Sequence, residues 1–160
     1  MKTKSLTFLL ALTFLFLFSG SSVVFGDDYR DGLEAAVKGD FKTAYKLWLP
    51  LAEQGIAQAQ EALGAMYSKG DGVQQDYKEA VRLFRLSAEQ GLANAQYSLG
   101  VMHLKGNGVQ QDYKEAVRLF RLSAEQGLAN AQYSLGVMHL KGNGVQQDYK
   151  EAVRLFRLSA

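Results

Sequence analysis

The sequence predicts an all-α solenoid built from stacked antiparallel helix pairs. Residues 88–123 are identical to residues 124–159, and residues 52–87 form a third copy that differs from them at eight of 36 positions. A fixed period of about 30 to 40 residues is typical of helical repeat arrays, in which each unit packs only on its neighbours. Because every unit must fold and stack, a residue shared by all copies is first of all a structural residue.

The first 26 residues have the pattern of a secretory signal peptide. A basic start with Lys2 and Lys4 precedes an apolar run over residues 6–18, and small residues follow it. A membrane-spanning helix needs about 20 apolar residues, and the polar stretch 19–22 ends this run too early. We therefore expect export to the periplasm or medium after cleavage behind Gly26, with an uncleaved membrane anchor as the alternative.

Composition excludes several classes of function. Lys2 and Lys4 belong to the predicted signal, so the 18 basic and 16 acidic residues of the chain become 16 of each after cleavage. A protein without a basic surplus is a poor nucleic-acid binder, and no nucleic-acid partner is expected. The chain has no cysteine. Disulfides and a lipid anchor on cysteine are thereby excluded, and helix packing alone must stabilise the domain.

The predicted mature region begins with an atypical helix pair over residues 27–55. Only Gly39 and Asp40 separate its two helices, and Trp48 and Pro50 stand where later units have phenylalanine and leucine. Terminal units of solenoids diverge in this way because one of their faces meets solvent. This pair is therefore predicted to cap the array.

Each later unit contains two helices with different patterns. In the middle unit, Asp112 caps the second helix, Glu115 completes a capping box, and Gly127 supplies a left-handed end. Gly100 lies inside the first helix, where glycine costs about 1 kcal/mol relative to alanine, which indicates close approach of a neighbouring helix. The units lie near 56–91, 92–127 and 128–160, and the helices of the array are expected near 28–38, 41–54, 56–69, 76–90, 92–105, 112–126, 128–141 and 148–160.

A set of small, polar and aromatic residues recurs at the same places in three units. In the middle unit these are Ala95, Gln96, Leu99, Gly100, Gly106, Gly108, Val109, Asp112, Tyr113, Ala116, Phe120, Ala124 and Gly127. The pattern resembles the Sel1-like repeat, which belongs to the tetratricopeptide-like α-solenoids. His103 and His139 depart from it, because the family usually has tyrosine there, as at Tyr67.

The resemblance implies a fold and a range of roles. It implies a right-handed superhelix whose first helices line the concave face, and a scaffolding or adaptor role, often in bacterial envelopes. Some cysteine-rich relatives have been associated with weak β-lactam binding or hydrolysis. This chain lacks those cysteines, so a weak β-lactam or cell-wall amide hydrolase is the least favoured alternative.

Neither a catalytic site nor a cofactor is expected. His103 and His139 are the only histidines. They should lie one repeat apart, about 10 Å or more, so they cannot share a metal ion, and packing is the simpler role. The loop 106–108 lacks the lysine and the preceding strand of a phosphate-binding loop. No nucleophile stands beside an oriented base, so we expect a protein that is not an enzyme.

Two surfaces are candidates for binding a partner, and the first lies on the first helices. Three of the eight differences between copies fall on this surface, whereas core positions are unchanged. Tyrosine combines apolar area with a polar tip, which suits recognition of a protein or peptide; the alternative is that Tyr97 packs against its own neighbours. This first-helix strip consists of Gln58, Glu61, Asn94, Tyr97, Val101, Asn130, Tyr133 and Val137.

The second candidate surface is a basic ladder on the second helices. It indicates binding of a polysaccharide or an anionic membrane surface, whereas the glutamates that interleave with it favour an ordinary solvated face of mixed charge. The basic ladder consists of Lys78, Arg82, Arg85, Lys114, Arg118, Arg121, Lys150, Arg154 and Arg157.

The last unit, which ends at Ala160, copies an internal unit without modification. Terminal repeats of solenoids need a polar outer face for solubility. We therefore expect an exposed apolar patch at Leu135, Met138, Val153 and Phe156, covered by self-association, by a partner, or by further repeats.

Overall fold

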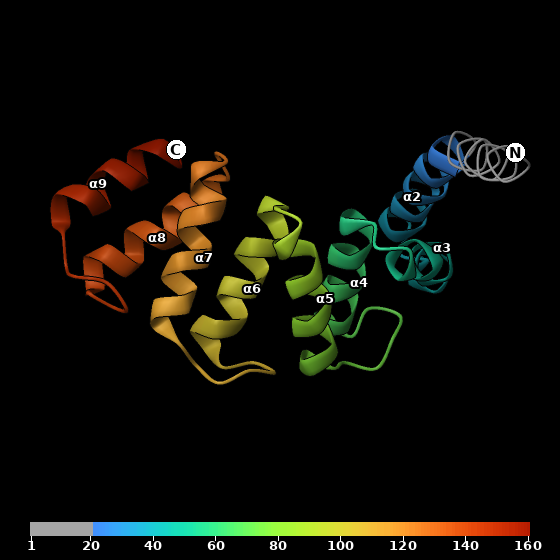
Figure 1. The fold of residues 1–160 in the computed structure, drawn as a ribbon, viewed down its shortest axis with the longest axis horizontal. Helices are drawn as coiled ribbons and strands as arrows, with labels where there is room; N and C mark the ends of the chain where they lie inside the picture. The colour runs from blue at the N-terminus through green and yellow to red at the C-terminus, as the bar shows by residue number, and fades with distance from the viewer. Residues whose placement is uncertain (1–20) are drawn as a thin grey trace, which may run out of the picture.

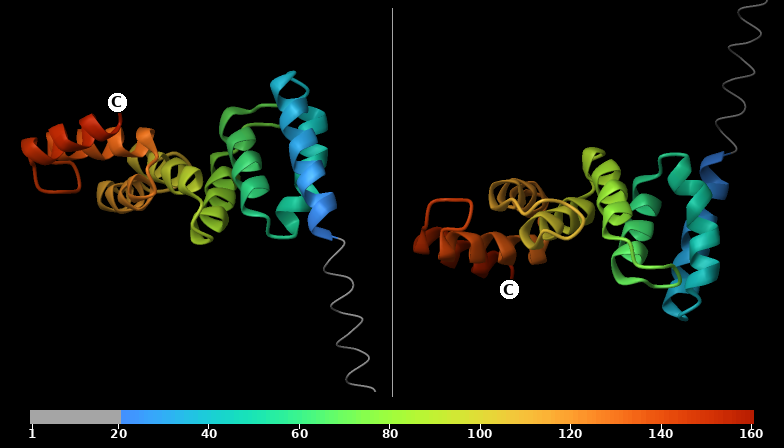
Figure 2. Two further views of the ribbon diagram at one scale, coloured as in Figure 1. Left: turned by 90° about the horizontal axis from the view of Figure 1, so that it is seen from above. Right: turned by 90° about the horizontal axis from the view of Figure 1, so that it is seen from below.

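The computed structural model describes residues 21–160, so most of the predicted signal peptide lies outside the described residues. The described residues form eight helices and no strand: α2 (Ser21–Val37), α3 (Phe41–Glu53), α4 (Ala57–Lys69), α5 (Tyr77–Glu89), α6 (Ala93–Lys105), α7 (Tyr113–Glu125), α8 (Ala129–Lys141) and α9 (Tyr149–Leu158). Each helix packs on those before and after it, and α2 and α9 lie at opposite ends of the array (Figure 1 and Figure 2). The predicted all-α solenoid of helix pairs is confirmed. Helix α2 runs through Gly26, and cleavage there stays a prediction.

The second helices begin at aspartate caps, as predicted, but the prediction of a capping box was wrong. The Asp112 carboxylate accepts from the backbone N–H groups of Lys114 and Glu115 at 2.9 and 3.0 Å. Glu115 does not reach back, because the Asp112 N–H already donates to the carbonyl of His103. Instead, the Glu115 carboxylate forms a two-pronged ion pair with Arg118, at 2.8 and 2.7 Å. Such charge-assisted pairs are stronger than neutral hydrogen bonds.

Each first helix contains a glycine that makes room for an aromatic ring of the second helix in its unit. A Cβ on Gly100 would lie 2.7 Å from Cε1 of Phe120, and a Cβ on Gly136 would lie at the same distance from Cε1 of Phe156. Phe120 is 0% exposed. The predicted close approach at Gly100 is therefore confirmed, and it fixes how tightly the two helices of a unit pack.

Loops between the helices connect successive units. Gly108 has a φ of +70° and lies against the backbone carbonyl of Tyr77, where the preceding second helix begins. Gly144 has the same contact with Tyr113. A Cβ there would overlap the carbonyl oxygen, so the glycine is required both by its backbone conformation and by the contact.

Glutamines add polar links between the units. The Gln96 side chain is buried, and its Nε2 donates to the carbonyl of Ala88 in the preceding unit at 3.4 Å. Its Oε1 accepts from Nε2 of Gln126 at 2.8 Å, and the same Nε2 donates to Gly91 at 3.0 Å. In the last unit, Oε1 of Gln132 is buried and has no hydrogen-bond partner.

The last unit exposes apolar surface, although two of the four residues expected there are buried. Leu135 and Met138 belong to a core cluster with Phe120 of α7 and Leu155 of α9, so the prediction was wrong for them. Val153 is 48% exposed, whereas its counterpart Val117 is 4% exposed. Phe156 is half-buried, and the other exposed apolar residues of this end patch are Tyr133, Leu140, Tyr149 and Leu158.

Candidate binding surfaces

The first-helix strip lies on α4, α6 and α8 and is partly accessible. Its polar members Gln58, Asn94 and Asn130 are exposed, whereas Val101 and Val137 are half-buried. Between α4 and α6 the surface is hollowed by a shallow cavity of about 200 Å³ with mostly apolar walls, lined by Ala65, Ser68, Lys69, Phe84, Tyr97, Ser98, Val101 and Met102. Two strip residues therefore form a wall of a cavity between neighbouring first helices.

The two tyrosines of the strip have different surroundings. The ring of Tyr97 lies 5.7 Å from that of Phe120 and packs against the core cluster that includes Leu135 of the next unit. The ring of Tyr133 lies 5.4 Å from that of Phe156, but Tyr133 is 58% exposed. Tyr97 thus contributes to packing, and Tyr133 offers its ring to solvent.

Glu61 occupies the strip position that is tyrosine in both later copies. Its side chain is half-buried, and burial raises the pKa of its carboxyl, while Lys69 acts in the opposite direction. Burial raises the pKa of Tyr29 too, and the charge of Glu61 adds to that effect. The strip therefore changes from an acidic character in α4 to an aromatic character in α6 and α8.

The basic ladder is exposed, but a third of its charges are neutralised. Arg82, Arg118 and Arg154 each form an ion pair with the glutamate three residues earlier, at 2.6 to 2.7 Å. These pairs lower the pKa of Glu115 and Glu151 through hydrogen bonds from the arginines. Among the described residues, the other six members of the ladder make no ion pair. The ladder is thus a surface of alternating charge rather than a continuous basic stripe.

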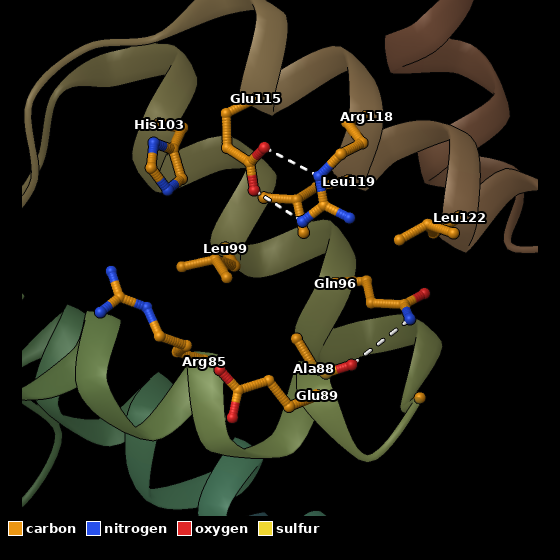
Figure 3. A pocket seen from close by; sticks show the side chains of 11 residues that line it. Arg85, Ala88, Glu89, Gln96, Leu99, His103, Glu115, Arg118, Leu119 and Leu122 are labelled. Atoms are coloured by element: carbon orange, nitrogen blue, oxygen red, sulfur yellow. Dashed lines mark hydrogen bonds and ion pairs between the residues drawn. The ribbon is translucent and has the colours of Figure 1, made fainter.

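The structure also contains two grooves that the sequence analysis did not predict. The α5–α7 groove lies between these second helices, with α6 as its floor, and has a volume of about 520 Å³ (Figure 3). It is lined by Arg85, Ala88, Glu89, Gly91, Gln96, Leu99, His103, Glu115, Arg118, Leu119 and Leu122. The α7–α9 groove, of about 600 Å³, is lined by Arg121, Ala124, Glu125, Gly127, Gln132, Leu135, His139, Glu151, Arg154, Leu155 and Leu158.

His103 and His139 are half-buried, and each lines one of these grooves. The Nδ1 atom of each ring is buried and has no hydrogen-bond partner. Packing is therefore only part of their role, because each imidazole ring also faces a groove with charged walls. Over residues 21–160, no cluster of three or more side chains suitable for a metal ion is present.

Four consecutive segments of the chain match the pattern of the Sel1 repeat: residues 26–56, 57–92, 93–128 and 129–160. The chain belongs to the Sel1 repeat family. These segments correspond to the helix pairs α2–α3, α4–α5, α6–α7 and α8–α9. No curated protein matches the chain.

Two solved structures share this fold. The chain is 37% identical to c5321, a protective antigen present in uropathogenic Escherichia coli strains, with a TM-score of 0.79 over 84% of this chain and 30% of that one. It is 33% identical to a Sel1 repeat protein from Oxalobacter formigenes, with a TM-score of 0.77 over 82% of this chain and 54% of that one. The chain thus spans about a third of the first relative and about half of the second.

The structure describes the helices of residues 21–160. None of them combines the length and the apolar character that crossing a bilayer requires.

Proposed function

We propose that this Sel1 repeat protein is an exported, non-catalytic scaffold that binds a protein or peptide partner along its first helices. Sel1 repeat proteins typically mediate protein–protein interactions. The observation that carries the proposal is the accessible aromatic surface on α8, where Tyr133 is exposed and the half-buried Val137 follows one helical turn later. Tyrosine in such a setting can bury a large ring and still keep its hydroxyl hydrogen-bonded.

A capture experiment with two tyrosine variants tests this function. The purified protein is immobilised, and envelope and secreted proteins of the source cells are passed over it. Tyr133→Ala should lose the captured partner. Tyr149→Ala is the matched control, because Tyr149 has a similar exposure of 62% but lies on α9, outside the first-helix strip. Retention of every captured protein by Tyr133→Ala would contradict the proposal.

Export rests on residues 1–26 and has its own test. Intact-mass measurement of the protein recovered from the periplasm or the medium should give a species that begins at Asp27. A species that keeps Met1 would instead indicate an uncleaved anchor, and recovery from the cytoplasm alone would overturn the proposed location.

We propose that the α9 part of the end patch, which consists of Tyr149, Val153 and Leu158, mediates self-association. Val153 offers a side chain that in the preceding unit is covered by the next helix pair. Sedimentation at tens of micromolar should show a dimer or larger species, and Val153→Lys should shift it to a monomer. A monomeric wild-type protein would refute this part of the proposal and leave the first-helix strip unaffected.

A further inference from the structure

The two grooves differ from the corresponding place in the preceding unit only at basic positions. The eleven residues that line the α5–α7 groove recur without change in the α7–α9 groove, 36 positions later. At the equivalent positions 36 residues earlier, nine are again the same. The two exceptions are Leu49 in place of Arg85 and Tyr67 in place of His103.

In the earlier unit neither of the two exceptional positions has a basic side chain. The hydroxyl of Tyr67 lies 3.1 Å from that of Tyr45, and this hydrogen bond is the main reason that the pKa of Tyr67 rises to about 12. That tyrosine is therefore neutral, and its hydroxyl is already hydrogen-bonded to the preceding helix pair. The later grooves instead contain a guanidinium and an imidazole together, which is a change in ligand preference at an otherwise constant lining.

The two basic groups lie at the same end of the α5–α7 groove. Arg85 extends from α5 toward the end where His103 projects from α6 (Figure 3). Among the described residues Arg85 makes no ion pair, whereas Arg118 on the opposite wall is held by Glu115. A free guanidinium presents several N–H donors in one plane, which matches a carboxylate. Because His103 already faces the charge of Glu115, Arg85 is the main binding group at this end, which is therefore suited to one carboxylate and not to several.

The middle of the groove has a different chemistry. Leu99 and Leu119 form its buried apolar floor, and Leu122 at its edge is 36% exposed, so a ligand that covers Leu122 gains about 25 cal/mol per Å² of buried apolar surface. Sugar hydroxyls placed over leucines would lose hydrogen bonds to water without gaining partners. Glu89 adds a second carboxylate to the walls besides Glu115, and it repels a ligand with many negative charges. The lining thus favours a single acid beside an aliphatic group over a charged polysaccharide.

We propose that each groove binds an acidic side chain and the aliphatic side chain two positions away, which lie on the same face of an extended segment of a protein partner. The carboxylate lies between Arg85 and His103, and the aliphatic group lies over the leucines. In the α7–α9 groove, Arg121 and His139 take these places. Because the two grooves are equivalent, a partner with two such motifs gains avidity through the effective concentration of the second one. This surface is separate from the first-helix strip, and the inference does not depend on it.

The two histidines provide a direct assay, since the chain contains no others. A capped peptide with the sequence Glu-Leu-Leu is titrated into the purified protein, and the imidazole resonances of His103 and His139 are followed by NMR. Both should shift on binding. The same peptide with Gln in place of Glu should bind about tenfold more weakly, because it lacks a charge-assisted hydrogen bond. An oligogalacturonate serves as the anionic glycan probe and should leave both resonances unchanged.

The chain itself supplies the matched variant. Arg85→Leu combined with His103→Tyr recreates the lining found one unit earlier, which this fold already accommodates. The Glu-Leu-Leu peptide should then still shift His139, and isothermal titration should show one tightly bound peptide per chain instead of two, because the altered groove binds about tenfold or more weakly. Tyr133→Ala should have no effect, which separates this inference from the proposed role of the first-helix strip. If the double variant does not fold, Arg85→Gln alone should weaken binding in the same groove.

Several results would overturn the inference. Equal binding of the Glu and Gln peptides would show that the basic pair does not select an acid. Peptide binding that leaves the histidine resonances unmoved would place the site elsewhere. A response to the oligogalacturonate in the absence of any response to the peptides would assign the grooves to a glycan. Failure of both peptides and the glycan to bind would remove the grooves as ligand sites.

Discussion

Gln126 is an exposed residue whose removal should nevertheless destabilise the array. Its Nε2 donates to the carbonyl of Gly91 at 3.0 Å and to Oε1 of the buried Gln96 at 2.8 Å. In Gln126→Ala both acceptors lose this donor, and a buried acceptor without a partner costs about 1–3 kcal/mol. Urea denaturation followed by circular dichroism should show this loss in the free energy of unfolding. A loss below about 0.5 kcal/mol, the usual range for surface substitutions, would refute the reasoning.

A second substitution tests whether the cost of Gln126→Ala comes from the unpaired Oε1 of Gln96. In Gln96→Met the acceptor is absent, so adding Gln126→Ala leaves no orphaned oxygen on that side chain. The double variant should therefore lose less stability than the sum of the single variants. Gln90→Ala is the equivalent change one unit earlier, where Nε2 bonds to Gly55 and to Gln60 at 2.9 Å, and its cost should be similar.

The last unit offers the reverse experiment. Oε1 of Gln132 lacks the donor that Gln126 supplies to Gln96. Adding Glu-Gln-Gly-Leu after Ala160 continues the repeat and places a glutamine where that donor belongs. The extended protein should be more stable than a control extended by Glu-Ala-Gly-Leu. Equal stability of the two extensions would show that the orphaned oxygen is not a cost to the fold.

Three further substitutions probe packing and charge. Gly108→Ala should cost more than about 2 kcal/mol, because it adds overlap with a backbone carbonyl to the strain of a positive φ. Gly91→Ala, at a φ of +89° with no atom within 4 Å of the added methyl, should cost about 1 kcal/mol, and equal melting temperatures would show that the contact is unimportant. Tyr97→Ala should lose about 2–3 kcal/mol and Tyr133→Ala much less; similar denaturation midpoints would contradict the difference in burial. Glu61→Gln should raise the melting temperature at neutral pH. A carboxyl whose pKa is raised by folding loses stability as the pH rises from its ordinary value near 4.5 through the raised value, so an advantage that persists below that window would contradict this account.

The sequence was sufficient for the helices, because their signals are local. Gly100 inside a helical pattern indicated a close contact, and Phe120 fills that space. Asp112 and Gly127 marked the ends of a helix that runs between them. The ion pair of Glu115 with Arg118 could also have been read from the three-residue spacing, which places the two side chains on one face. Assigning Glu115 to a capping box obscured that signal.

The grooves could not be found in the same way, because their residues come from three helices. Arg85, His103 and Glu115 are exposed or half-buried side chains with an ordinary place in each amphipathic pattern. Only the crossing of α5, α6 and α7 brings them to one cavity (Figure 3). The burial of Leu135 was missed for a related reason, since the enclosure by α7 and α9 depends on how tightly a unit closes on itself.

Because each repeat unit contacts only the adjacent units, the number of units in such a chain can change. The junction between α5 and α6 and the junction between α7 and α8 join the same residues, and no helix of one end touches the other end. Gain or loss of one of the two identical 36-residue blocks therefore leaves every remaining junction as it was. The length of the array can therefore change by whole repeats, through duplication or deletion of a block in its gene. Each added repeat would bring another groove with the same lining. The number of grooves could therefore be matched to the number of acidic motifs in a partner, without any change in the residues that contact each motif.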